Sequence, residues 1–185
     1  MKENKENFFM SSSKFFLGLF FSLLVRLLPF RAPNIEPILS VTMPFSKYFG
    51  AFSSFSFAVL SILLYDVITS TLGVQTFFTA FAYGTLAICS AIYFKKYEAS
   101  RWHFVRFAVI GTLFFDAATG LTAGPMFFHQ SFLQALSGQI PFTILHLIGN
   151  IIFALVLSPA IYNSLVRKRK SIETSTIKIL NPKTI

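Results

Sequence analysis

The sequence is short of charged residues and of cysteine. Only 12% of its 185 residues are charged, 16 of them basic and seven acidic. A soluble domain of this length could not hide the several continuous apolar stretches that the chain contains. Its one cysteine, Cys89, lies in an apolar stretch and supports neither a disulfide nor a metal cluster. Composition therefore excludes a secreted, disulfide-stabilised domain and points to a membrane protein.

Catalytic signatures are also missing. The sequence has no His-Glu-x-x-His, no Gly-x-Ser-x-Gly and no phosphate-binding Gly-Lys-Ser/Thr motif. Asp66 and Asp116 could form an aspartyl pair, but aromatic residues precede both where intramembrane proteases carry Gly-x-Gly. His129 and His146 could bind a metal with an acid, although their spacing specifies none. We expect no enzyme activity, no cofactor and no metal, and any uphill transport needs a gradient or a separate energy-coupling partner.

Apolar residues dominate what is present. They make up 54% of the chain, and 25 residues are Phe. A membrane-spanning helix needs about 20 mostly apolar residues. The candidates are roughly residues 14–29, 38–54, 56–73, 76–94, 104–120 and 140–164. We therefore predict an all-α integral membrane bundle of about six transmembrane helices. Five remains the alternative, because only Ser53 and Ser54 separate the second and third candidates.

The basic residues predict the orientation, since cytoplasmic loops are enriched in Lys and Arg. The run 167–170 follows the last candidate span, and further basic residues lie at 95–106 and near the N-terminus. Both termini should be cytoplasmic, with a cytoplasmic segment at 1–13, a transmembrane domain at 14–166 and a basic, flexible tail at 167–185. The net charge of +9 is spread over several loops, so we expect no nucleic-acid partner. The expected location is the cell (inner) membrane.

Two aspartates are the most informative polar residues. Asp66 and Asp116 each end an apolar run and are each followed three residues later by Thr. A carboxylate in hydrocarbon costs roughly 2.5–3.5 kcal/mol on insertion scales, so such a group usually faces a cavity or a partner. Both acids fall in the outer half of parallel segments, which predicts a site for a polar ligand. The alternative is a chance echo of two acids near helix ends.

Other polar residues fall on the same outer side. They are Asn34 and Glu36 in the first outer loop, His129 and Gln139 near the last outer loop, and His146 and Asn150 on the last helix. His146 and Asn150 are four residues apart and share a helix face. We expect these groups to converge with the two acids on an outward-facing pocket, with the 30–37 loop as its lid. The alternatives are interhelical hydrogen bonds for His146 and Asn150, a solvated charge for Glu36 and an interfacial position for His129.

Two stretches resemble a known family. Gly138-Gln-Ile-Pro-Phe-Thr-Ile-Leu-His-Leu-Ile-Gly-Asn150 is similar to the last helix of substrate-binding S components of energy-coupling factor (ECF) vitamin transporters. Pro33-Asn-Ile-Glu-Pro-Ile-Leu-Ser-Val41 resembles the loop and second-helix start of a poorly characterised branch. The resemblance spans about residues 26–164. It implies a six-helix bundle that binds a micronutrient from outside and docks on a membrane coupling protein driven by two ATPase subunits.

The resemblance also suggests a docking surface. S components often meet the coupling protein through small residues on the first helix, and the nearest match here is Gly18-x-x-x-Ser22. Ordinary helix packing is the alternative. The expected function is thus membrane-embedded capture of a small, vitamin-like substrate, with membrane lipid around the bundle. A stand-alone channel or facilitator and a non-transporting structural membrane protein are the rival interpretations.

Overall fold

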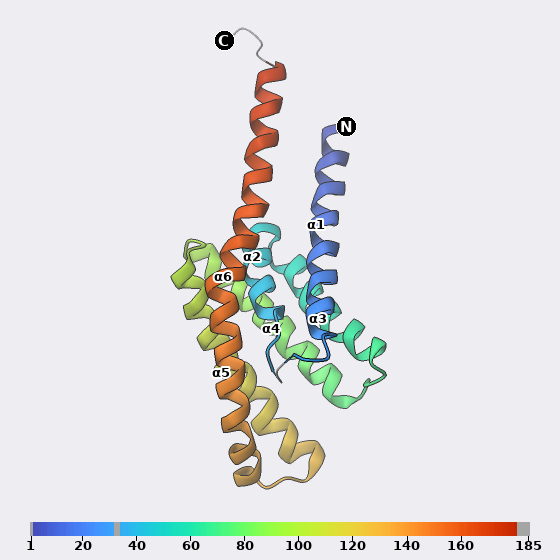
Figure 1. Ribbon diagram of the computed structural model, residues 1–185, viewed down its shortest axis with the longest axis vertical. Coiled ribbons are helices and arrows are strands. Elements are labelled where there is room, and N and C mark those ends of the chain that lie inside the picture. Colours follow the sequence, from blue (N-terminus) through green and yellow to red (C-terminus); the bar gives the residue numbers. More distant parts are fainter. Residues whose placement is uncertain (1, 32–33, 181–185) are drawn as a thin grey trace.

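The computed structural model describes residues 2–31 and 34–180 of the chain, and all of its regular structure there is helical. The six helices are α1 Lys2–Arg26, α2 Ile38–Phe49, α3 Ala51–Ile68, α4 Val74–Lys96, α5 Arg101–Phe128 and α6 Phe132–Leu180. Figure 1 shows them packed as a bundle in which α5 and α6 form the longest antiparallel pair. The predicted all-α membrane fold is confirmed.

Four of the described helices, α3 to α6, are long and apolar enough to cross a membrane. α2 is different. Its 12 residues span about 18 Å, less than the roughly 30 Å of a bilayer's hydrocarbon core. Residues 38–46 of α2 are all buried, and α2 contacts every other helix. The second predicted span is therefore a short helix at the centre of the bundle.

Aromatic and aliphatic side chains pack around α2. Ile38, Leu39 and Met43 lie in one cluster with Tyr83 and Phe104, while Val41 and Phe45 lie in a second cluster beside α1 and α3. Apolar side chains gain little by leaving lipid, so close van der Waals contact stabilises such a core inside a bilayer. The lipid-facing surface carries large exposed side chains, among them Phe20, Phe77, Phe81, Ile110 and Val156.

The break between α2 and α3 lies at Gly50, not at Ser53-Ser54 as the sequence suggested. Gly50 has φ +88°, a backbone conformation that residues with a side chain rarely adopt. Ser53 and Ser54 lie inside α3, where the Ser54 hydroxyl donates to Gly50 O at 2.8 Å. This bond back to an earlier carbonyl satisfies the hydroxyl within the helix, so two serines do not end the helix.

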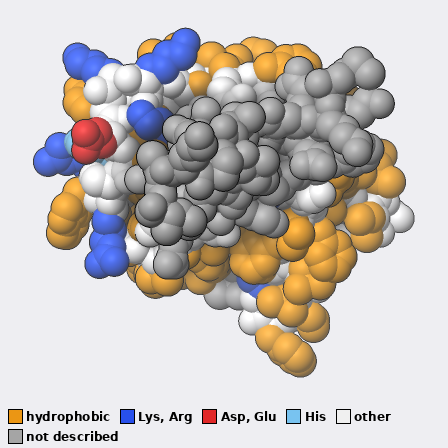
Figure 2. Space-filling model, turned by 90° about the horizontal axis from the view of Figure 1, so that it is seen from above, with side chains coloured by type: hydrophobic (Ala, Val, Ile, Leu, Met, Phe, Trp, Pro, Cys, Tyr) orange, Lys and Arg blue, Asp and Glu red, His pale blue; other side chains and the backbone are white. Residues whose placement is uncertain are grey.

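The start of α1 and the end of α6 lie at one end of the molecule, and the α3–α4 and α5–α6 turns lie toward the other (Figure 1). α6 runs on to Leu180, so the backbone of 167–180, predicted as a flexible tail, is helical. Residues 181–185 lie outside the described part. Seen from the end with the termini, Lys and Arg side chains gather along one side of the molecule, with hydrophobic side chains around the rest (Figure 2). The side of the membrane that the two termini face stays a prediction.

Candidate functional site

A buried acid–imidazole pair joins the two longest helices. Asp116 on α5 accepts at Oδ1 from the Nδ1 side of His146 on α6, over 2.7 Å. Asp116 is 1% exposed and His146 is 2% exposed. Ionisable groups at membrane depth almost always pair with one another or face a cavity, because an isolated charge is costly there. The pair is thus both a link between α5 and α6 and a concentration of charge inside the bundle.

Tyr83 on α4 extends this pair toward the loop between α1 and α2. Its hydroxyl donates to Glu36 Oε1 at 2.9 Å and lies 3.5 Å from His146 Nε2. Its ring packs against Phe115 with centroids 4.3 Å apart. The hydroxyl has a single proton and two acceptors within reach when the imidazole is neutral with its proton on Nδ1. Tyr83 therefore connects the outer loop to the buried histidine.

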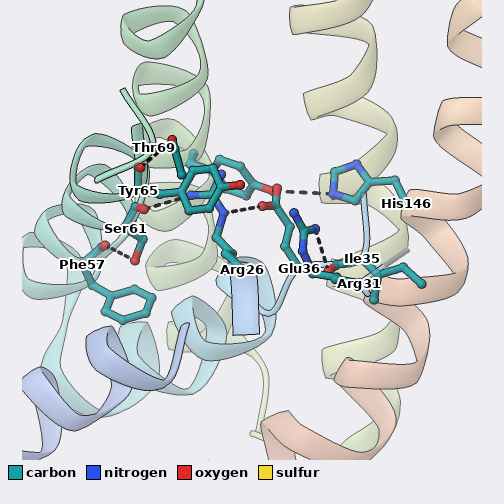
Figure 3. A network of polar contacts seen from close by, with 10 residues as sticks. Arg26, Arg31, Ile35, Glu36, Phe57, Ser61, Tyr65, Thr69 and His146 are labelled. Atoms are coloured by element: carbon teal, nitrogen blue, oxygen red, sulfur yellow. Dashed lines mark hydrogen bonds and ion pairs between the residues drawn. The ribbon is translucent and has the colours of Figure 1, made fainter. Parts of the chain in front are cut away.

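Arg26, the last residue of α1, completes the network. Its Nε lies 2.8 Å from Glu36 Oε2, and its Nη1 donates to Ser61 O at 2.9 Å. The Nε–H is not aligned with the carboxylate, so the contact with Glu36 is an ion pair without a directed hydrogen bond from that nitrogen. The guanidinium also stacks over Tyr65, 3.8 Å from the ring centroid (Figure 3). Arginine commonly combines ion pairing with such stacking.

These contacts form one polar chain, Arg26–Glu36–Tyr83–His146–Asp116, to which α1, the α1–α2 loop, α4, α6 and α5 each contribute one residue. The loop residues 34–37 cover it. Ile35 packs on Gly149 of α6, where an added Cβ would lie 3.2 Å from Ile35 Cγ1. Arg31 Nη1 donates to Ile35 O at 2.9 Å and ties the loop together (Figure 3). Asn34 adopts a left-handed φ of 64° where the loop turns toward α2.

A second polar contact lies one helical turn further along the same pair of helices. Asn150, four residues after His146, donates from Nδ2 to Thr112 Oγ1 at 2.8 Å, and Thr112 lies four residues before Asp116. Both residues are buried. In the part of the chain that the structure describes, Asp116 Oδ2 and Asn150 Oδ1 have no hydrogen-bond partner. Two buried acceptors on neighbouring turns are thus open to a donor or a cation.

The structure brings together Glu36, Asp116, His146 and Asn150 but leaves Asp66 outside this group. Asp66 lies in the last turn of α3, half-buried, and accepts from Thr76 Oγ1 at 2.5 Å. Thr76 in turn accepts from the Gly73 N–H at 3.1 Å, so Asp66 fastens the α3–α4 turn. The two acids therefore share a sequence pattern without sharing a site.

His129 and Gln139 also lie apart from the polar chain. His129 is exposed and ends α5 with a left-handed φ of 52°. Gln139 donates from Nε2 to Thr143 Oγ1 at 3.1 Å and packs on Gly120, where a Cβ would overlap its side-chain oxygen. Both residues lie in the half of the α5–α6 pair nearer the α5–α6 turn, and Asn34 belongs to the α1–α2 loop.

The small residues on α1 face the chain's own α2. A Cβ on Gly18 would lie 2.5 Å from Phe45 Cζ, and Ser22 is completely buried. Gly18 also borders a lateral groove of about 370 Å³ between α1 and α6, whose walls are almost entirely apolar and include Leu17, Phe21, Leu157 and Ile161. No member of the polar chain lines this groove. The contacts described are those of close helix packing inside the chain.

Sequence reasoning missed three residues of the site: Arg26, Tyr83 and Thr112. Arg26 was not predicted as a site residue, although an ionisable residue at the end of an apolar run can mark a site. Thr112 precedes Asp116 by four residues, so the helical period places both on one face of α5. Tyr83 carries no local signal beyond its small neighbours Ala82 and Gly84.

Chemically, the site offers a carboxylate, an imidazole, an amide and a tyrosine hydroxyl beside the Phe115 and Phe142 rings, which lie 5.6 and 5.8 Å from the His146 ring. Such a mixture of few polar groups and aromatic surface is typical of small-molecule sites. Within the described residues, no group of three or more His, Cys, Asp or Glu could hold a metal ion.

Comparisons with protein-family models, with curated proteins and with solved structures found no match to this chain.

Proposed function

We propose that this membrane protein is the substrate-binding subunit of an uptake system for a small, vitamin-like micronutrient in the cell (inner) membrane. A separate coupling protein with ATPase subunits would supply the energy, as the resemblance of 138–150 to ECF S components implies. The observation that supports the proposal is the buried polar chain under the outer loop. A membrane protein that needed only a stable bundle could use apolar contacts here, since buried ion pairs are weak sources of stability.

The covering loop supports access from outside. Loop residues 34–37 rest on α6 through Ile35 and on α4 through the Glu36–Tyr83 hydrogen bond of 2.9 Å. Lifting this loop would break only a few contacts and would uncover Tyr83 and His146. A ligand bound beneath it would be shielded from water, which strengthens each polar contact that it makes.

A structural role is the second candidate, and one observation favours it. Most polar groups of the site already satisfy one another: Arg26 with Glu36, Tyr83 with Glu36, His146 with Asp116 and Asn150 with Thr112. In membranes such interhelical hydrogen bonds average about 0.6 kcal/mol and can hold a bundle in one arrangement. A purely structural role predicts that no small molecule stays with the purified protein.

Native mass spectrometry of the full chain, extracted gently from its own cells, separates the candidates. The proposal predicts a retained small molecule and peaks from ATPase and coupling subunits. A chain that carries a small molecule but no partner subunits would favour a stand-alone facilitator. A chain with neither would favour the structural role and would contradict the proposal.

A further inference from the structure

Two unsatisfied oxygens lie on adjacent turns of the α5–α6 pair. Asp116 uses Oδ1 for His146, and Asn150 uses Nδ2 for Thr112, which leaves Asp116 Oδ2 and Asn150 Oδ1 without donors in the described part of the chain. The residues are 1% and 2% exposed. Thr112 and Asp116 are four residues apart on α5, and His146 and Asn150 are four residues apart on α6, so members of each pair lie about 5–6 Å apart at Cβ. The hydrogen bonds Asn150–Thr112 and His146–Asp116 join these two pairs, which places Asn150 on the turn next to Asp116. The Thr112 hydroxyl oxygen borders the same region.

This arrangement is costly as it stands. A buried acceptor without a partner costs about 1–3 kcal/mol, and more when it belongs to a carboxylate. Arg26 does not compensate Asp116, because its guanidinium pairs with Glu36 at 2.8 Å and donates to Ser61 O at 2.9 Å. His146 contacts only one of the two carboxylate oxygens of Asp116. Among the described residues, no Lys or Arg bonds either of the two free oxygens, so the region has oxygen ligands without a compensating donor.

We propose that this region, bounded by Asp116 Oδ2, Asn150 Oδ1 and Thr112 Oγ1, binds a small monovalent cation. Carboxylate, amide and hydroxyl oxygens are the ligands that hard cations prefer. One carboxylate balances one positive charge, and the described residues contain no cluster of three or more His, Cys, Asp or Glu that a multivalent ion would need. The cation neutralises Asp116 while His146 orients the carboxylate from the other side.

The cation site shares Asp116 with the polar chain, but its other ligands, Asn150 and Thr112, lie outside that chain, and the inference does not depend on the identity of an organic substrate. It lies one turn deeper in the bundle than the Tyr83–His146 contact, on the side toward Asn150. A cation there would hold α5 and α6 in the arrangement that presents His146 Nε2 to the loop. Cation binding would thus prepare the polar chain for its ligand.

The test is thermal unfolding of the full, detergent-purified chain at constant ionic strength, with Na⁺, K⁺ or methylammonium replacing the bulky cation N-methylglucamine. At a cation concentration tenfold above its dissociation constant, the midpoint should rise by roughly 3–6 °C. The rise should saturate with concentration, and the three arms show whether the preferred ion is a metal or an amine. A midpoint that is the same in all four cations overturns the proposal.

Three variants locate the effect. Asp116→Asn should abolish the cation-dependent rise, and Thr112→Val, which keeps the side-chain volume, should weaken it. Asp66→Asn is the matched control, because Asp66 is also an acid in an α-helix but bonds Thr76, and it should retain the full rise. If Asp116→Asn does not fold, Thr112→Val decides the question alone. A full rise in Thr112→Val, or a loss of the rise in Asp66→Asn, contradicts the assignment.

Discussion

Within the described residues, the Asp116 carboxylate has one hydrogen-bond partner, the His146 ring at 2.7 Å. Both side chains are almost completely buried. A buried ion pair contributes little net stability, yet removing one partner leaves an uncompensated charge inside the protein. At the scale of single residues, removing either Asp116 or His146 alone should therefore cost much more stability than removing both together.

His146→Leu should lower the free energy of unfolding by about 3–5 kcal/mol, because it strands the Asp116 carboxylate. Replacing both residues by Leu should recover most of that loss, since no charge is then buried. Equilibrium unfolding in mixed micelles measures both variants. His129→Leu, at an exposed position, is the control and should change the value by no more than about 0.5 kcal/mol. This coupling would be contradicted if the double variant lost as much unfolding free energy as the two single Leu variants together.

Part of this site could be predicted from the sequence, and the reason is local. Helical spacing places His146 with Asn150, and an acid in an apolar run marks Asp116 as a site residue. Tyr83 could not be found this way, because its partner Glu36 lies 47 residues away and the pairing depends on which helices become neighbours.

The repeated Asp-x-x-Thr pattern led to a wrong grouping of Asp66 with Asp116 for a related reason. In both copies the following Thr donates to the carbonyl before the acid, Thr69 to Tyr65 O and Thr119 to Phe115 O, each at 2.8 Å. The shared pattern is therefore a local back-bond, and the surroundings of the acids are set by other helices.

At the scale of helices, α2 is the element that the sequence describes least well. Its apolar residues merge with those of α3, so the pattern 38–54 reads as one span. The structure divides it at Gly50, whose φ of +88° turns the chain. Composition cannot show this, because a glycine inside a helix and a glycine at a break look alike in sequence. The short, buried α2 then places Glu36 close to Tyr83.

Gly50→Ala should destabilise the protein by about 1–3 kcal/mol, because φ +88° with ψ −177° is a backbone conformation that essentially only glycine adopts. Gly138→Ala is the matched control. An added Cβ meets nothing within 4 Å at either position, but Gly138 lies inside α6 with ordinary helical geometry. The control should be neutral or stabilising by up to about 1 kcal/mol. Equal effects of the two substitutions on the unfolding free energy would contradict the role of Gly50.

The covering loop is a second element whose seat can be tested. Gly149→Val would place side-chain atoms where Ile35 now packs. The Cα of Ile35 lies only 3.3 Å from a Cβ added at Gly149, so the loop should lift from α6. A cysteine at Asn34 in a Cys89→Ser background should then react faster with a water-soluble maleimide. Gly138→Val, which faces open space, serves as the control and should leave the labelling rate unchanged. Unchanged labelling in Gly149→Val would show that the loop is not seated through this contact.

At the scale of the whole molecule, the sequence predicts the fold class better than it predicts the residues of the site. Apolar length depends on the bilayer rather than on particular neighbours, so the all-helical membrane class follows from composition. The number of spans does not follow as well, because six were predicted and four described helices are long and apolar enough to cross a membrane. The cytoplasmic side of the termini stays a prediction. Packing partners do not follow, because lipid and protein interior are equally apolar and select similar residues. The central position of α2 in the bundle is therefore the feature that composition predicted least well.

The orientation itself can be measured with an impermeant maleimide on cells that express single-cysteine variants lacking Cys89. Ser70→Cys, exposed in the α3–α4 turn, should be labelled in intact cells. Ser100→Cys, exposed before α5, should be labelled only after permeabilisation. The reverse pattern would place the polar chain and its loop toward the cytoplasm, which is incompatible with capture from outside.

The most direct test of ligand binding at the polar chain is the amount of small molecule that stays with the purified protein, measured by mass spectrometry after extraction. Tyr83→Phe and Asp116→Asn each remove a polar contact, and each should lower retention about tenfold or more. Asp66→Asn should retain as much as the unmodified chain. Equal retention in all of these proteins, or a loss only in Asp66→Asn, would contradict binding at the buried polar chain.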